Sequence, residues 1–214
     1  MHIFLIRHGE TALNAAGVLR GQLDIPLNET GEAEARSLGE AFREVPLNAV
    51  VSSPLKRALD TALPVAAGTK APLSIDDRLS DRFYGELAGH SLEQVEKRFG
   101  SIDAAPLVEA WQLLEARAQE AFLDAAGSLA APDASQGDPR RNGAGTLARA
   151  ATPSAALVTH DAVIRALLRL LVPALGSVRL ELPTGSWSEL VFDSFDGRWR
   201  AVQLGKLPAD GSRP

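Results

Sequence analysis

The chain has 214 residues, no cysteine and a net charge of −5 at pH 7. Its 45% apolar and 23% charged content suits a single α/β domain over residues 1–214, and the missing thiols exclude disulfides, thiol catalysis and thiolate metal sites. The negative charge argues against a nucleic-acid partner, and no apolar run is long enough to span a membrane. We expect a cytoplasmic protein, because a strand predicted from residue 2 leaves no room for a signal peptide.

The first predicted element is a strand whose core, Ile3-Phe4-Leu5-Ile6, is apolar at every position. Such a run indicates a strand that is buried on both faces of a sheet. Arg7 and His8 follow it directly, at the strand end where ligands collect in open α/β sheets. His8 is therefore a candidate catalytic residue.

A second strand runs into a helix after residues 49–51. Ser53 and Pro54 are typical of a helix N-cap and first helical position, and the helical pattern reaches about residue 67. Arg57 falls in the first turn of this predicted helix.

A third strand, over residues 155–159, leads through His160 into an amphipathic helix predicted over 162–172. Helix starts offer unpaired N–H groups and the positive end of the helix dipole, and arginine forks fit phosphate oxygens. His8 and His160 add groups that titrate near neutral pH. Together the three junctions predict an anion site.

The other predicted elements alternate between strand and helix. They are helices over 31–45, 91–99 and 107–129 and strands near 73–75, 178–182, 188–194 and 198–204, the last two joined as a hairpin through Asp196-Gly197. This order predicts an α/β three-layer sandwich: a mostly parallel sheet with helices on both faces and an antiparallel C-terminal edge.

Two segments lie outside this regular order. Residues 130–154 contain three prolines and no periodicity, and we expect a mobile loop there. This loop enters the third strand from its amino end, so it hangs from the face away from the chemistry. Residues 82–110 leave the sheet on the side of the histidines and are the better candidate for a lid.

Five sequence blocks, in order and spacing, resemble the histidine phosphatase superfamily, the phosphoglycerate mutase-like proteins. The blocks are Leu5-Ile6-Arg7-His8-Gly9-Glu10-Thr11 with Asn14, Arg20-Gly21-Gln22 through Gly31, Ser52-Ser53-Pro54-Leu55-Lys56-Arg57-Ala58, Leu79-Ser80-Asp81-Arg82-Phe83-Tyr84-Gly85, and Val158-Thr159-His160. The resemblance implies a phosphoglycerate mutase-like fold. It also implies that His8 takes up a phosphoryl group, that Arg7, Arg57 and His160 bind the phosphate, and that Asn14 lies beside them.

The same resemblance places the proton donor for the leaving group at Asp81, where the family usually has glutamate. Glu86 on the same loop is the second candidate for this role. Asp161 is the third, because another branch of the superfamily uses an aspartate after the second histidine. The branch resembled here more often has glycine at that position. We expect Asp161 to cap the helix that follows and to lower the affinity for phosphate.

These residues predict a metal-independent phosphatase that hydrolyses small phosphomonoesters through a phosphohistidine on His8, with no cofactor and no metal. A phosphoglycerate mutase-type phosphotransferase is the alternative. The short stretch over 99–106 favours the phosphatase, because an open site admits water. A non-catalytic phosphate-binding module is a third reading, although such a module would be expected to lose one of Arg7, His8, Arg57 or His160.

The rest of the substrate is predicted to meet residues on the loops around this site. The candidates are Arg20, Gln22, Arg82 and Tyr84, with Asp161 as a further contact. The two arginines would suit a second anionic group, such as a carboxylate. For partners we expect a small phosphorylated metabolite, with a homodimer left open.

Overall fold

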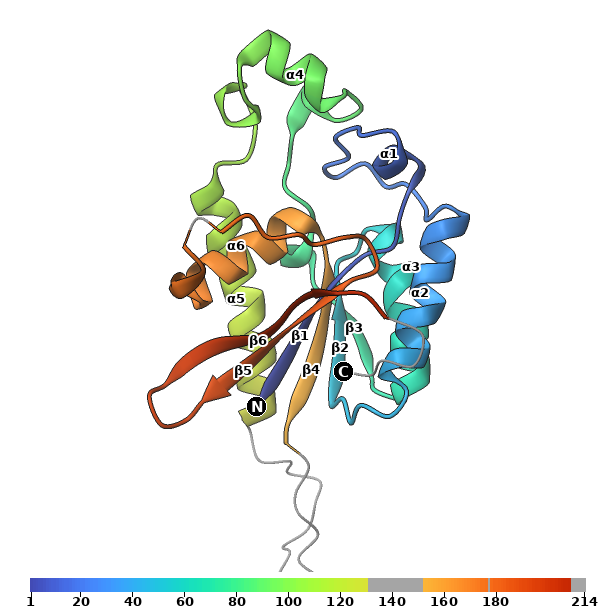
Figure 1. Ribbon diagram of the computed structural model, residues 1–214, viewed down its shortest axis with the longest axis vertical. Helices are drawn as coiled ribbons and strands as arrows, with labels where there is room; N and C mark the ends of the chain where they lie inside the picture. The colour runs from blue at the N-terminus through green and yellow to red at the C-terminus, as the bar shows by residue number, and fades with distance from the viewer. Residues whose placement is uncertain (131–151, 177, 209–214) are drawn as a thin grey trace, which may run out of the picture.

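The computed structural model describes residues 1–130, 152–176 and 178–208, and a single six-stranded sheet lies at its centre (Figure 1). The strand order is β3-β2-β4-β1-β5-β6. The strands are β1 (His2–Arg7), β2 (Ala49–Ser52), β3 (Leu73–Ile75), β4 (Ser154–Thr159), β5 (Trp187–Asp193) and β6 (Arg198–Lys206). The first four strands are parallel to one another, β5 is antiparallel to β1, and β6 is antiparallel to β5. The C-terminal edge is therefore antiparallel, as the sequence predicted.

Helices cover both faces of this sheet. Figure 1 shows α2 (Glu29–Phe42) and α3 (Lys56–Thr69) on one side and α5 (Trp111–Ala130) and α6 (Asp161–Leu171) on the other. Alternate residues of β1 serve the two layers: Ile3 and Leu5 pack toward α5 and α6, and Phe4 and Ile6 pack toward α2 and α3. The three-layer α/β sandwich is therefore confirmed.

The carboxyl ends of β1, β2 and β4 meet at one edge of the sheet. Arg7 pairs in register with Thr159, and Ser52 pairs with Val158. The chain segments that follow these three strands therefore begin side by side. Every residue of β4 is buried, which fixes this edge within the core.

Residues 82–110, which we call the lid segment, rise above this edge (Figure 1). They carry η2 (Gly85–Leu87), α4 (Leu92–Phe99) and η3 (Ile102–Ala104). The segment has a small core of its own, in which Leu87, Val95 and Ala105 are buried together. A short helix, α1 (Ala12–Ala15), precedes the neighbouring loop, and Val18 of that loop pairs with Ser91 of the lid segment.

Four predicted elements differ from the observed ones. The helix predicted over 31–45 is α2, which begins and ends earlier. No strand forms over 178–182: the carbonyl groups of Leu180 and Leu182 accept hydrogen bonds from arginine side chains instead of a neighbouring strand. The helix predicted from Pro54 is α3, which starts at Lys56. The hydroxyl of Ser53 accepts a hydrogen bond from the N–H of Leu55, and Asp24 accepts from the N–H of Lys56 at 2.6 Å.

The fourth difference concerns α5, which begins at Trp111 rather than near residue 107. The loop predicted over 130–154 lies almost entirely outside the described residues. Two further short helices, η1 (Asp77–Leu79) and η5 (Pro173–Leu175), lie within connections. None of the helices in the described ranges is long and apolar enough to cross a membrane.

Candidate active site

His8 and His160 stand at the ends of the adjacent strands β1 and β4. The N–H of His8 donates to the carbonyl of Thr159 at 3.0 Å, which continues the strand pairing by one residue. The two imidazole rings lie 5.1 Å apart between centroids, and both are buried. The structure thus brings together the two histidines that the sequence placed at separate junctions.

Contacts on both nitrogens orient the ring of His8. Its Nδ1 lies 2.6 Å from the carbonyl of Gly9, an acceptor, so Nδ1 carries the proton and Nε2 carries the lone pair. Arg57 Nε donates to that Nε2 at 3.3 Å. Burial, with help from the Arg57 charge, holds the pKa of His8 well below its ordinary value. The imidazole is therefore neutral at pH 7.

Arg57 is fully buried, although it carries a charge. Its two terminal nitrogens donate to the carbonyl groups of Leu23 and Gly21 at 2.8 and 2.7 Å, and one of them also meets Asp81 at 3.1 Å. The N–H groups of the guanidinium thus donate to fixed acceptors, and these hydrogen bonds offset the cost of burying its charge. The hydrogen bonds to Gly21 and Leu23 hold the loop that follows α1 next to Arg57.

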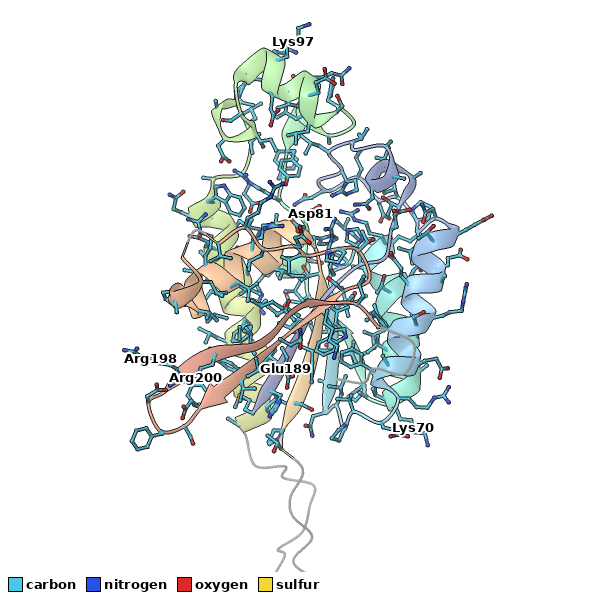
Figure 2. All side chains as sticks on the ribbon, viewed as in Figure 1. Lys70, Asp81, Lys97, Glu189, Arg198 and Arg200 are labelled. Atoms are coloured by element: carbon cyan, nitrogen blue, oxygen red, sulfur yellow. The ribbon has the colours of Figure 1, made fainter. Side chains whose placement is uncertain are left out.

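Asp81 meets the same terminal nitrogen of Arg57 that donates to the carbonyl of Gly21. Figure 2 shows it near the upper ends of the strands, below the lid segment. One carboxylate oxygen accepts from the N–H of Arg82 at 2.9 Å, and the other meets Arg57 and lies 4.0 Å from His160 Nδ1. Burial raises the pKa of Asp81, although the charges of Arg57 and Arg20 oppose this shift.

His160 is held by Ser53, whose hydroxyl lies 2.8 Å from Nε2. Its Nδ1 is buried and has no hydrogen-bond partner among the described residues. Burial and the charge of Arg57 keep the pKa of His160 well below its usual range. An unpartnered nitrogen in a buried cluster is a group that a ligand can satisfy.

Arg7 reaches the site from the end of β1. One terminal nitrogen donates to the carbonyl of Leu182 and lies 3.5 Å from a carboxylate oxygen of Asp161. Its Nε is buried and unpartnered within the described part of the chain. Burial lowers the pKa of Arg7, and the nearby Asp161 partly reverses this effect.

Asp161 does not cap its helix, so that prediction was wrong. His160 occupies the N-cap position, and Asp161 is the first helical residue. Its carboxylate accepts two hydrogen bonds from Arg165, one turn further along, at 2.7 and 3.1 Å. Its carboxylate thus pairs with Arg165 and lies 3.5 Å from Arg7.

Asn14 serves as a capping residue in this structure. Its side-chain oxygen accepts from the backbone N–H and the hydroxyl of Thr11, at 3.1 and 2.8 Å, in a capping box at the start of α1. Whether it also touches phosphate stays a prediction. Glu86, the second candidate for the proton donor, is exposed on η2 and lines a separate cavity in the lid segment with His90 and Arg98.

The residues predicted to contact the rest of the substrate differ in burial and in hydrogen-bond partners. Arg82 is buried, with an ion pair to Asp103 at 2.6 Å and with its guanidinium 4.5 Å from the ring of Trp111. Tyr84 is half-buried, and burial raises the pKa of its hydroxyl. Gln22 is exposed and donates to the carbonyl of Asp81 at 3.1 Å.

Sequence reasoning missed three supporting residues. Ser53 positions His160, and Thr61 accepts from the N–H of Gly9 at 3.0 Å. Arg117 of α5 donates to the carbonyl groups of Ser80 and Asp81, at 2.6 and 3.0 Å, and so fixes the loop that carries Asp81. Ser53 and Thr61 lie in or beside a block that the sequence singled out, whereas Arg117 reads as an ordinary charged helix residue.

Within the described residues, no group of three or more histidine, aspartate or glutamate side chains is arranged to hold a metal ion. The arrangement can instead bind an anion with arginine forks and imidazole nitrogens. It also offers a neutral imidazole as a nucleophile and a buried carboxyl group as a proton donor.

The chain is similar in sequence to known phosphatases and phosphoglycerate mutases. An uncharacterized phosphatase of Bacillus subtilis is 40% identical over 97 residues, which are 45% of this chain and 50% of that protein. A 2,3-bisphosphoglycerate-dependent phosphoglycerate mutase of Bifidobacterium longum is 38% identical over 103 residues, 46% of this chain and 42% of that protein. The chain thus spans about half the length of these curated relatives, or less.

A solved structure matches over nearly the whole chain. The mycobacterial glucosyl-3-phosphoglycerate phosphatase superposes with a TM-score of 0.74 and 26% identity, and covers 94% of this chain and 97% of its own. The model of one family, described as histidine phosphatase superfamily (branch 1), matches residues 3–132, which is more than half of the chain. The chain therefore belongs to the histidine phosphatase superfamily, branch 1.

Proposed function

We propose that this protein is a metal-independent phosphatase that hydrolyses small phosphomonoesters through a phosphohistidine on Nε2 of His8. The observation that carries the proposal is the orientation of that nitrogen. Its ring is neutral, its other nitrogen is bound to the carbonyl of Gly9, and Nε2 faces Arg57 in a buried cluster. A neutral, oriented imidazole is a competent nucleophile toward phosphorus.

In the first step, Nε2 of His8 attacks phosphorus and the bond between phosphorus and the ester oxygen breaks. Arg7, Arg57 and His160 would stabilise the charge on the equatorial oxygens, which is the main source of catalysis in phosphoryl transfer. The leaving alkoxide takes a proton from Asp81. The raised pKa that burial gives Asp81 supports this role, because it shifts the carboxyl group toward the protonated form that a proton donor needs.

In the second step, water attacks the phosphohistidine and passes a proton to the Asp81 carboxylate. The bond between phosphorus and Nε2 breaks, inorganic phosphate leaves, and His8 and Asp81 return to their starting states. The net reaction consumes one water molecule. No proton or electron is left over.

A mutase activity is the second candidate, and the phosphoglycerate mutase among the curated relatives supports it. A mutase must keep water from the phosphohistidine until the phosphoryl group returns to the substrate. In the lid segment only residues 100–110, with the three-residue helix η3, separate α4 from α5. This short connection favours an open site and hence hydrolysis.

The test is hydrolysis of p-nitrophenyl phosphate in a buffer that contains EDTA. We expect the wild-type protein to turn over the ester and His8→Ala to lose turnover by at least 10³-fold, which is the order expected for a covalent nucleophile. Brief incubation with a phosphate ester labelled in the phosphoryl group, followed by an alkaline quench, should trap the label on His8 in the wild type.

His90→Ala is the matched control, because His90 is exposed in the lid segment and lies away from the two buried histidines. Loss of activity on chelation would contradict metal independence. Conversion of 3-phosphoglycerate to its 2-isomer in the presence of a bisphosphoglycerate, without release of inorganic phosphate, would favour the mutase.

A further inference from the structure

Arg20 differs from the other arginines around the candidate site, because it has no carboxylate partner among the described residues. Arg7 lies beside Asp161, Arg57 beside Asp81, and Arg82 beside Asp103. Arg20 donates one hydrogen bond, to the carbonyl of Val18 at 3.1 Å. Its Nε is buried and has no hydrogen-bond partner in the part of the chain that the structure describes. Buried donors are nearly always satisfied in proteins, so an orphan beside an active site points to a ligand group.

The charge of Arg20 acts on the site as a whole. After burial and the effect of Arg57, it contributes to lowering the pKa of both His8 and His160, and it opposes the upward shift of the pKa of Asp81. Such effects reach only groups that lie close in a poorly screened environment. Arg20 is half-buried, with a buried Nε, and its charge acts on His8, His160 and Asp81.

The backbone that carries Arg20 lies against the lid segment. The phosphate-binding groups Arg7 and His160 follow the strand ends, below the lid segment. Arg20 instead follows a stretch that pairs with the lid segment: Leu19 exchanges backbone hydrogen bonds with Gly89 and His90 at 2.8 and 2.9 Å. A phosphomonoester bound at the strand ends would extend its organic part toward this stretch.

Arg82, the other arginine on this side, has fewer free donors. Its Nε donates to the carbonyl of Glu109 at 2.8 Å, its terminal group pairs with Asp103, and its guanidinium lies near the ring of Trp111. These contacts join the lid segment to the start of α5. Arg82 is thus engaged within the protein, and Arg20 remains as the available cation.

We propose that Arg20 binds a second anionic group of the substrate, a carboxylate or a second phosphate, and so selects phosphomonoesters that carry two negative groups. This inference rests on the proposed function only for the position of the first phosphate. The second anion would supply the acceptor that Arg20 Nε lacks. A planar guanidinium suits both a carboxylate and a phosphate.

The test compares matched ligands that differ in the second anion. In one pair, 3-phosphoglycerate carries a carboxylate where glycerol 3-phosphate carries a hydroxymethyl group. In the other, fructose 1,6-bisphosphate carries a second phosphate that fructose 6-phosphate lacks. The ratio of kcat/KM within each pair cancels effects on the shared phosphate, and the pair with the larger ratio identifies the second anion.

We expect the wild type to favour the doubly anionic member of at least one pair. Arg20→Gln should lower that ratio by roughly 10- to 100-fold, as for loss of a charged hydrogen bond, and Arg20→Lys should keep most of it. Arg36→Gln, at an exposed position on α2, is the control and should leave the ratio unchanged. A wild-type ratio near one in both pairs, or a ratio that falls in Arg82→Gln and not in Arg20→Gln, would overturn the inference.

Calorimetric binding of the same ligands to His8→Ala protein separates this inference from the proposed function. If no ester is turned over by the wild type, but the binding preference for two anions is present and disappears with Arg20→Gln, the proposed function fails and the inference stands. If turnover is seen and Arg20→Gln leaves the ratio intact, the inference alone fails. The melting temperature of each variant verifies that it is folded.

Discussion

Arg57 and His8 share a hydrogen bond in which the Nε of the guanidinium donates to Nε2 of the imidazole at 3.3 Å. The same guanidinium meets the carboxylate of Asp81 at 3.1 Å. The proposed nucleophile and the proposed proton donor are therefore positioned by one side chain. Its remaining bonds, to Gly21 and Leu23, tie that position to the loop after α1.

Replacing Arg57 with lysine tests this shared support. A lysine keeps the charge but cannot reach His8, Asp81 and two carbonyl groups at once, because it lacks the planar fork. We expect kcat/KM for p-nitrophenyl phosphate to fall by about 10²- to 10³-fold. Because a buried ion pair is disrupted, the free energy of unfolding in urea should fall by about 3 kcal/mol. Arg36→Lys, at an exposed position on α2, should change neither quantity; activity of Arg57→Lys within threefold of wild type would contradict the assignment.

The two buried histidines also predict how stability depends on pH. Their pKa values are lowered in the folded protein, so between the lowered value and the ordinary value near 6.5 the unfolded chain binds more protons. Stability is therefore highest above pH 6.5 and falls as the pH drops. The expected slope approaches about 1.4 kcal/mol per pH unit for each histidine. Urea unfolding of wild type and of His8→Gln/His160→Gln between pH 7.5 and 5 measures it.

The double variant should show a flatter curve over this range, and His90→Gln, changed at an exposed position, should keep the wild-type slope. Asp81 contributes the opposite sign, because its pKa is raised and the folded state holds its proton longer. That contribution appears above the ordinary pKa of aspartate and remains in the double variant. Equal slopes in wild type and double variant would contradict the burial of neutral imidazoles.

The strand ends were predictable because their signals are local. A short apolar run followed by polar residues is enough to predict a strand and the point where it ends. The sequence pattern therefore placed His8, Arg57 and His160 at or just after strand ends. The helix start at Lys56 could not be predicted in this way, because Asp24 supplies the acceptor for its N–H from 32 positions away. The failed strand over 178–182 has the same origin: its apolar pattern is typical of a strand, but arginine side chains take its carbonyl groups.

The ion-pair partners of charged side chains could not be predicted from the sequence either. Asp161 was expected to cap its helix, because aspartate favours that position, yet Arg7 from β1 and Arg165 compete for its carboxylate. Arg20 and Arg82 looked alike in the sequence. Only the fold shows that Asp103 of the lid segment neutralises one of them and that the other lacks a carboxylate partner within the described residues.

Asp161 is expected to weaken the binding of inorganic phosphate. Its carboxylate lies 3.5 Å from Arg7, so it competes with phosphate for that cation and repels the incoming charge. Asp161→Asn keeps the shape and removes the charge, and phosphate should then bind about three- to tenfold more tightly, as expected for one partly exposed charge. Calorimetry at fixed ionic strength measures the dissociation constant. Asp196→Asn, in the distant hairpin, is the control; weaker binding to Asp161→Asn would show instead that the carboxylate holds Arg7 in place.

The role of Asp81 can be tested by changing how much help the leaving group needs. p-Nitrophenolate leaves readily without a proton, whereas the alkoxide of glycerol 3-phosphate does not. If Asp81 is the proton donor, Asp81→Asn should lower kcat/KM for glycerol 3-phosphate by about 10²- to 10⁴-fold and that for p-nitrophenyl phosphate by far less. Asp81→Glu keeps a carboxyl group at this site and should preserve most of the activity toward both esters.

The two rival donors provide the controls for that comparison. Glu86→Gln and Asp161→Asn should each leave the ratio between the two esters unchanged, because Glu86 is exposed in the lid segment and the carboxylate of Asp161 is held by Arg165. Equal losses on both esters in Asp81→Asn would mean that Asp81 acts by positioning Arg57, to which it is bonded at 3.1 Å. A selective loss in Glu86→Gln would instead transfer the proton-donor role to the lid segment, and it would require that segment to close over the bound ester.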